Sequence, residues 1–176
     1  MVVMLLFPLL IPTFVVESYN ENNTMRVLCV KRKIMIIFKE NVLDVDTYLA
    51  LRKSVKWKRL SREQAQKALD NSLYTVCAYD FDRPIGMGRL VGDGAVICYV
   101  QDLVIHPDAQ YMGIGGQILN MLIAYTEGLR LEGTEMMLDL MCAKGREQFY
   151  EKFGFIARPT EQLGPGMIQY LKGEKQ

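Results

Sequence analysis

A glycine-rich segment, residues 110–116 (QYMGIGG), is the clearest candidate for a chemical role, because it joins an apolar run to a long stretch with helical periodicity. Glycines at positions 113, 115 and 116 leave out side chains where a ligand could approach the chain. A helix that begins here directs its first N–H groups and the positive end of its dipole to one place. Such a place favours an anion, and diphosphate is the natural ligand. On its own, the segment is also compatible with a tight strand-to-helix junction.

Known phosphate-binding loops differ from this segment. No Lys-Ser or Lys-Thr pair follows the glycines, as a P-loop requires, and the acidic residue of a dinucleotide-binding fingerprint is poorly placed. A different phosphate ligand is therefore expected.

Few other side chains could carry chemistry. His106 is the only histidine, which excludes a zinc site built from several histidines and a histidine triad elsewhere in the chain, and we expect no metal. The four cysteines lie far apart without a CxxC pair, so we interpret them as reduced, buried thiols. Gln101 and Asp102 interrupt the otherwise apolar residues 95–105, and two polar residues in a central strand need a reason.

Strand-like and helix-like segments alternate beyond Met35, which predicts one mixed α/β domain. Strands are predicted at residues 36–39, 73–79, 85–91, 95–105 and 136–142, with a last pair at 155–157 and 167–171. Helices are predicted at residues 44–55, 61–71, 113–131 and 146–153, the second beginning with a capping box of Ser61 and Gln64. The glycine-rich segment is thus expected where a buried strand enters the longest helix.

The first 34 residues differ from the rest. Residues 1–16 are almost continuously apolar, are broken by Pro8 and Pro12, and are too few for the ~18–20 that a spanning helix needs. The first basic residue is Arg26, so a secretory signal is a poor fit. We interpret residues 1–34 as an extension outside a domain at residues 35–173, and a membrane-associating or self-packing N-terminus is the alternative.

Charges nearly cancel, with 21 Lys and Arg against 20 Asp and Glu scattered among one another. No basic field is present to attract nucleic acid or anionic lipid, so neither nucleic acid nor a membrane is an expected partner. A small neutral or weakly charged partner is predicted. Reduced thiols favour a cytoplasmic location.

Two motifs resemble those of the GNAT superfamily of acyl-CoA-dependent N-acyltransferases. Gln110-x-x-Gly113-x-Gly115 is similar to the family's Gln/Arg-x-x-Gly-x-Gly/Ala coenzyme A motif, and residues 100–107 (VQDLVIHP) are typical of the strand before it. Residues 149–155 (FYEKFGF) resemble the family's Tyr-x-x-x-Gly-Phe segment. The resemblance covers about residues 36–171.

This resemblance implies a splayed, mixed central sheet of about six to seven strands flanked by about four helices. It also implies acetyl-CoA as co-substrate, bound in a V-shaped opening between residues 95–105 and 136–142. Backbone groups of the strand would contact the pantetheine, and those of the loop would contact the pyrophosphate. The residues implied in coenzyme A binding are Leu103, Val104, Ile105, Gln110, Tyr111, Met112, Gly113, Ile114, Gly115, Gly116 and Gln117.

Acetyl transfer to an amine requires proton transfers, because an alkylammonium has a pKa near ~10. Asp102 is the first candidate for the base, since partial burial raises the pKa of a carboxylate, and an ion pair with a Lys or Arg is the alternative. The resemblance implies Tyr150 as the general acid that protonates the departing thiolate, and the N–H of Leu103 or Val104 as the group that meets the oxyanion. The fallback groups for the base are Tyr99, Gln101 and Asp139.

The acceptor is expected to be a primary amine, first of all on a small molecule. Trp57, Lys58 and Arg59 lie where the family builds its acceptor pocket, although a surface aromatic tied to the neighbouring helices is an equal interpretation. A protein N-terminus or lysine as acceptor, or a coenzyme A-binding module without turnover, are alternatives. The family also allows a homodimer through the last strands.

Overall fold

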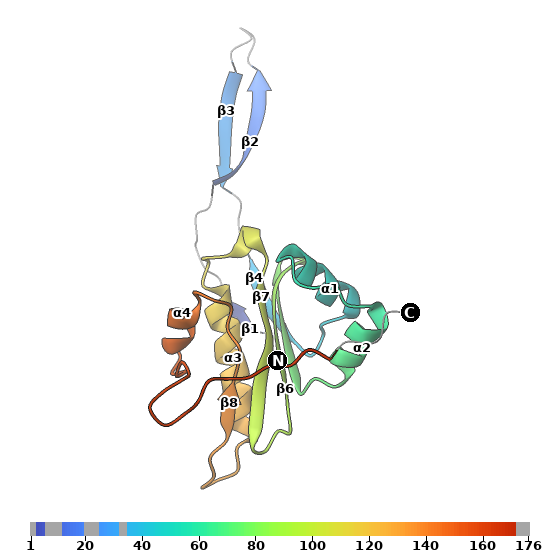
Figure 1. Cartoon of the computed structure of the whole chain (residues 1–176). Coiled ribbons are helices and arrows are strands. Elements are labelled where there is room, and N and C mark those ends of the chain that lie inside the picture. Colours follow the sequence, from blue (N-terminus) through green and yellow to red (C-terminus); the bar gives the residue numbers. More distant parts are fainter. Residues whose placement is uncertain (1–2, 6–11, 20–24, 32–34, 172–176) are drawn as a thin grey trace.

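A mixed sheet with helices on both faces forms the body of the protein (Figure 1). The computed structural model describes residues 3–5, 12–19, 25–31 and 35–171. Helices α1 (Val45–Ser54) and α2 (Arg62–Asp70) cover one face, and α3 (Ile114–Leu129) and α4 (Glu147–Glu151) cover the other. Among the described residues, no helix combines the length and apolarity needed to cross a membrane.

The sheet has the order β1-β4-β5-β6-β7-β8, and only the last pair, β7 with β8, is parallel. Its strands are β1 (Val3–Leu5), β4 (Ile36–Glu40), β5 (Tyr74–Asp80), β6 (Arg83–Gly92), β7 (Ile97–Ile105) and β8 (Met137–Asp139). A separate antiparallel pair, β2 (Pro12–Tyr19) and β3 (Met25–Lys31), extends away from the sheet (Figure 1). The predicted mixed α/β class with four helices is confirmed. The division of the chain between residues 34 and 35 stays a prediction.

Residues 35–171 form fewer strands than the seven predicted for them. Residues 35–171 contribute five strands, because 155–157 and 167–171 form none. The latter segment leaves its apolar side chains exposed, with Met167 at 90% and Leu171 at 89%. The predicted strand at 136–142 is also shortened to three residues, since β7 diverges from it as described below.

Side-chain caps set the starts of α1 and α2. The Asp44 carboxylate accepts from the N–H groups of Asp46 and Thr47, both at 2.9 Å. Ser61 Oγ accepts from the Gln64 N–H at 3.0 Å, as the capping box predicted, and the helix ends at Asn71 as expected.

Helix α3 packs close to the sheet because β6 carries a glycine beneath it. A Cβ built on Gly88 would lie 2.4 Å from Ile118 Cγ2 and 3.0 Å from Leu122 Cδ1. Both of these helix residues are fully buried in the core on this face. The opposite face has its own core, which includes Tyr48, Leu51, Met87 and Val104. The position of α3, and of the loop that precedes it, is therefore fixed by direct contact with the sheet.

Candidate active site

Strands β7 and β8 separate in the middle of the sheet. Their parallel pairing ends at Tyr99 with Asp139, although β7 continues for six residues to Ile105. The register of β7 against β6 shifts at the same level, from Leu90 with Val100 to Arg89 with Asp102, so Gln101 is the extra residue of a β-bulge. A bulge bends its strand and increases the local twist. The splayed pair implied by the GNAT resemblance is present, between the expected segments.

The bulge also exchanges the faces to which β7 side chains point. Val100 packs in the core beneath α3, and beyond the bulge Leu103 and Ile105 pack against that same core. Val104 belongs to the core beneath α1, on the opposite face. Simple alternation would have placed Val100 and Val104 on one face. The bulge therefore directs Asp102 towards α1 and leaves Gln101 exposed.

The glycine-rich loop lies at the open end of this V. A short 3₁₀ turn, η1 (Pro107–Ala109), follows β7, and Gly113 then caps α3 with a left-handed φ of 78° and without a side-chain hydrogen bond. The first N–H groups of a helix have no intrahelical partner, so those of Ile114, Gly115 and Gly116 are available to a ligand. Gln110 Nε2 donates to the Ile105 carbonyl at 3.2 Å and ties the loop to the strand.

The three glycines of the loop have different structural roles. A Cβ at Gly113 would meet nothing within 4 Å, so its positive φ is what favours glycine. A Cβ at Gly116 would lie 3.1 Å from Phe153 Cζ, so this glycine lets the C-terminal segment pack on α3. A Cβ at Gly115 would make ordinary contacts, the nearest at 3.5 Å from Ile105 Cγ1. Approach of a phosphate to these three glycines stays a prediction.

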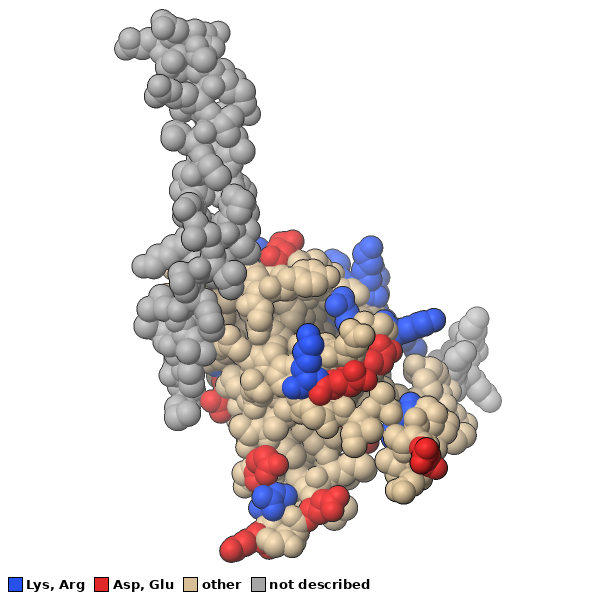
Figure 2. Space-filling view, turned by 90° about the vertical axis from the view of Figure 1, so that its left-hand side faces the viewer, with Lys and Arg blue, Asp and Glu red and all other residues tan. Residues whose placement is uncertain are grey.

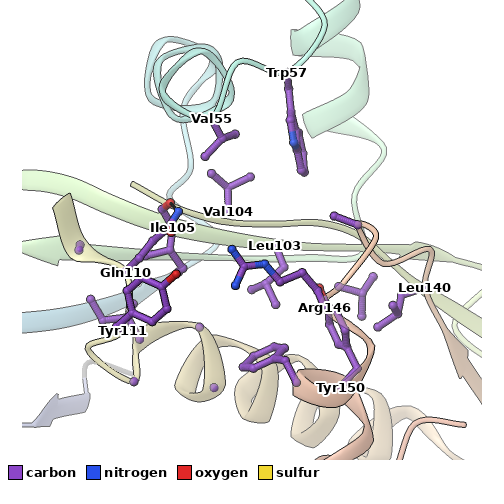
Figure 3. A pocket seen from close by; sticks show the side chains of 18 of the residues that line it. Val55, Trp57, Leu103, Val104, Ile105, Gln110, Tyr111, Leu140, Arg146 and Tyr150 are labelled. Atoms are coloured by element: carbon purple, nitrogen blue, oxygen red, sulfur yellow. Dashed lines mark hydrogen bonds between the residues drawn. The ribbon is translucent and has the colours of Figure 1, made fainter. Parts of the chain in front are cut away.

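A cavity of about 420 Å³ fills the opening between the strands. In Figure 3 the loop borders it on one side, Arg146 and Tyr150 on the other, and Val55 and Trp57 close it from the α1 side. Three predicted residues, Asp102, Met112 and Gln117, are not among its lining residues. The predicted residues that line it are Leu103, Val104, Ile105, Gln110, Tyr111, Gly113, Ile114, Gly115, Gly116 and Tyr150.

Tyr150 and Arg146 reach the cavity from the same turn of chain. Arg146 is the N-cap residue of α4 and Tyr150 lies within that helix, and Figure 3 shows the Arg146 side chain extending into the cavity beside Tyr150. Burial raises the pKa of the Tyr150 hydroxyl, the nearby Cys142 thiol raises it further, and the Arg146 cation opposes both. The hydroxyl is therefore protonated at neutral pH. Sequence reasoning missed Arg146, although its spacing from Tyr150 was a usable signal.

Asp102 is enclosed by cations and a hydroxyl. Its side chain has no exposed surface, Oδ1 lies 2.8 Å from Arg52 Nη1, and Oδ2 lies 2.7 Å from Arg89 Nε. The Tyr48 hydroxyl donates to Oδ2 at 3.0 Å. These contacts correspond to the ion-pair alternative, and they give the proposed base no free oxygen towards the cavity.

Asp139 is the fallback carboxylate that the structure leaves with a free oxygen. It is the last β8 residue paired with β7, directly before cavity-lining Leu140 and Met141. Its Oδ1 is buried and has no hydrogen-bond partner among the described residues. Burial raises its pKa, and the Arg158 cation opposes this shift.

Of the fallback groups for the base, Gln101 lines the cavity, whereas Tyr99 and Asp139 do not. No group of three or more His, Cys, Asp or Glu in the described part of the chain could hold a metal ion.

The chain matches the model of a known protein family. The family model for an acetyltransferase (GNAT) domain matches residues 70–157, half of the chain, and so spans β5, β6, β7, the loop, α3, β8 and α4. The chain belongs to the GNAT acetyltransferase family. The membership predicted from the two motifs is therefore confirmed.

The chain is similar to several solved structures. A structure of a protein of unknown function from meticillin-resistant Staphylococcus aureus, described as a probable acetyltransferase, is 33% identical, with a TM-score of 0.68 over 77% of this chain and 100% of that one. A GNAT family acetyltransferase from Streptococcus pneumoniae is 28% identical, with a TM-score of 0.67 over 79% and 100%.

Among curated proteins, the ycf52-like N-acetyltransferase of Prochlorococcus marinus is 31% identical over 66% of this chain. Serotonin N-acetyltransferase 2 of Oryza sativa is 26% identical over 69%. The chain covers 65% and 61% of the length of these two relatives.

Proposed function

We propose that this GNAT protein transfers an acetyl group from acetyl-CoA to a primary amine of a small molecule, by direct attack of the amine on the thioester. The observation that carries the proposal is the meeting of the uncapped α3 N-terminus and Tyr150 on one cavity between β7 and β8. An anion site and a proton donor on the same cavity suit a donor that has a pyrophosphate at one end and a thioester at the other.

Donor binding rests on the backbone of the loop. The N–H groups of Ile114, Gly115 and Gly116 and the helix dipole would hold the pyrophosphate. The cavity then continues past Ile105 and Leu103 towards Tyr150, which gives the pantetheine a path along the unpaired edge of β7.

Strand geometry favours Leu103 over Val104 for the oxyanion. The His106 N–H donates to the Ile85 carbonyl of β6 at 2.8 Å. Backbone groups alternate in direction along a strand, so Val104 is oriented like His106, towards β6, and Leu103 is oriented away from it. The Leu103 N–H would therefore stabilise the negative charge that develops on the thioester oxygen.

Two side chains would handle the protons. Tyr150 would donate its hydroxyl proton to the sulfur as the carbon–sulfur bond breaks. Asp139 would accept a proton from the attacking amine through water, since its buried oxygen is free and its raised pKa makes it a better base than an exposed aspartate. Asp102 would hold the α1 side of the site in place through its two arginines.

The direct test is an amine-panel assay that follows free thiol from acetyl-CoA. The panel contains arylalkylamines, amino sugars and polyamines, and a peptide with a free N-terminus and a lysine. Thiol release with a small amine, and none when the amine is omitted, is the expected result. Release with the peptide alone would identify a protein acceptor instead. Coenzyme A binding without release from any amine would indicate a binding module.

A further inference from the structure

A second hollow lies beside Trp57, lined by the C-terminal part of α1 and the segment that leads to α2. Its volume is about 540 Å³, and Trp57 and Arg52 are among its lining residues. Trp57 also lines the cavity between β7 and β8, so the two spaces share this residue. The other lining cations are Lys53, Lys56, Lys58 and Arg59.

We propose that this basic hollow, formed by Lys53, Lys56, Lys58 and Arg59 around Trp57, binds an anionic group of the acceptor, so that the substrate is an amine bearing a carboxylate or a phosphate. The inference rests on the acetyl transfer proposed above and names the class of acceptor. It departs from the neutral partner that the overall charge balance predicted, because that balance hides a local excess of cations.

The four cations are free to meet a ligand. Within the described residues, none of them forms a salt bridge, whereas Arg62, Arg83 and Arg130 elsewhere on the surface each pair with a carboxylate. No Asp or Glu is among the residues that line the hollow. In the view of Figure 2, Lys and Arg gather on the upper right of the domain and Asp and Glu dominate its lower end. An anion entering the hollow would therefore meet uncompensated positive charge.

Lys56, one of these lysines, has a left-handed backbone conformation that is unfavourable for residues other than glycine. Lys56 has a φ of 59°, and the Trp57 N–H bonds to the Arg52 carbonyl at 3.1 Å, as in a Schellman ending of α1. Glycine usually fills this left-handed position because a Cβ is unfavourable there. The left-handed turn at Lys56 leads the chain to Trp57, which lines the cavity. The Lys56 side chain adds a cation to the hollow.

Arg52 holds Trp57, the residue that the two spaces share, in position. The Arg52 guanidinium lies 5.0 Å from the centre of the Trp57 ring, and its Nη1 is bonded to the buried Asp102. Arg52 Nη2 also donates to the Lys58 carbonyl at 3.4 Å, which links the segment to the same arginine. A buried carboxylate of the central sheet thus fixes both Trp57 and the backbone that carries the lysines. An acceptor could place its anion in the hollow and pass its amine beside Trp57 to the thioester.

Pairs of acceptor amines with and without an anionic group test the proposed class of acceptor directly. Each pair differs only in the anion, for example an amino sugar with its phosphate ester, or an aromatic amino acid with its decarboxylated amine. Higher kcat/KM for the anionic member is expected, with a loss of about two- to fivefold for each neutralised cation in Lys56→Gln, Lys58→Gln and Arg59→Gln. Lys67→Gln on α2 is the matched control, since that lysine is exposed but does not line the hollow, and it should leave the preference intact.

Trp57 supplies a readout that does not depend on turnover, because it is the only tryptophan in the chain. Anionic members should change its fluorescence at lower concentration than their neutral partners. A variant that combines Lys56→Gln, Lys58→Gln and Arg59→Gln should lose this difference. Equal titrations and equal kcat/KM within every pair would overturn the inference while leaving acetyl transfer intact. A selective fluorescence response without thiol release would instead retain the anion site and contradict the proposed reaction.

Discussion

Asp102 Oδ1 lies 2.8 Å from Arg52 Nη1, joining the central strand β7 to helix α1 across 50 residues of sequence. Arg89 occupies the second oxygen, so two largely buried cations depend on one carboxylate. The arrangement makes Asp102 a structural anchor of the site.

Asp102→Asn should therefore destabilise the fold strongly. Removing one partner of a buried ion pair costs about 3–5 kcal/mol, because the remaining charges stay desolvated and unpaired. Denaturant unfolding measures the change. Asp46→Asn removes the partner of Arg62 in an exposed pair and should leave the unfolding midpoint unchanged. Equal midpoints for the two variants would contradict the anchoring role of Asp102.

Much of the fold around the site could be predicted from the sequence. The features that could not be predicted have physical causes. The start of α1 near Asp44, the cap at Ser61 and the start of α3 were predictable because each depends on a few adjacent residues. The face to which Asp102 points was not, because the bulge at Gln101 depends on how β6 and β7 pair. The ion pairs of Arg52 and Arg89 with Asp102 could not be predicted either, because they join three segments that are distant in the sequence.

The end of the chain shows another limit of sequence reasoning. Residues 167–171 have an apolar composition typical of strands, yet a strand also requires a neighbouring backbone to pair with. β8 offers a three-residue edge, and the apolar side chains of 167–171 remain exposed. Composition predicts the tendency, whereas pairing decides the outcome.

Gly113→Val should weaken coenzyme A binding by at least about tenfold. Valine disfavours the φ of 78° that turns the loop into α3, so the N–H groups of the helix start would no longer converge on the pyrophosphate. Calorimetric titration with coenzyme A gives the affinity. Gly133→Val is the matched control, because Gly133 has a φ of 73° and equally open surroundings outside the loop. Unchanged affinity in Gly113→Val would remove the loop from donor binding.

The dependence of kcat on pH should show no falling limb from Tyr150 below about pH 10. A general acid is lost as pH rises through its pKa, and burial places the pKa of Tyr150 above its ordinary value. The rate should instead rise with pH as Asp139 and the acceptor amine lose protons. A Tyr150-dependent fall near neutral pH would contradict the protonated, buried hydroxyl.

Arg146→Gln should lower kcat more than Arg146→Lys does. The Arg146 cation lowers the pKa of Tyr150, so its loss makes the hydroxyl a weaker acid, and lysine retains the charge. Steady-state kinetics at saturating acetyl-CoA separates the two variants. Identical rates would show that the cation in the cavity does not act on Tyr150.

The most direct test of the proposed chemistry compares the wild-type protein with Tyr150→Phe in two measurements, kcat for thiol release and Kd for coenzyme A. Phenylalanine keeps the ring in its place against Phe149 and Phe155 and removes only the proton donor. The expected result is a fall in kcat of about 100-fold or more with an unchanged Kd. An unchanged kcat would contradict the assignment of Tyr150 as the acid that completes acetyl transfer.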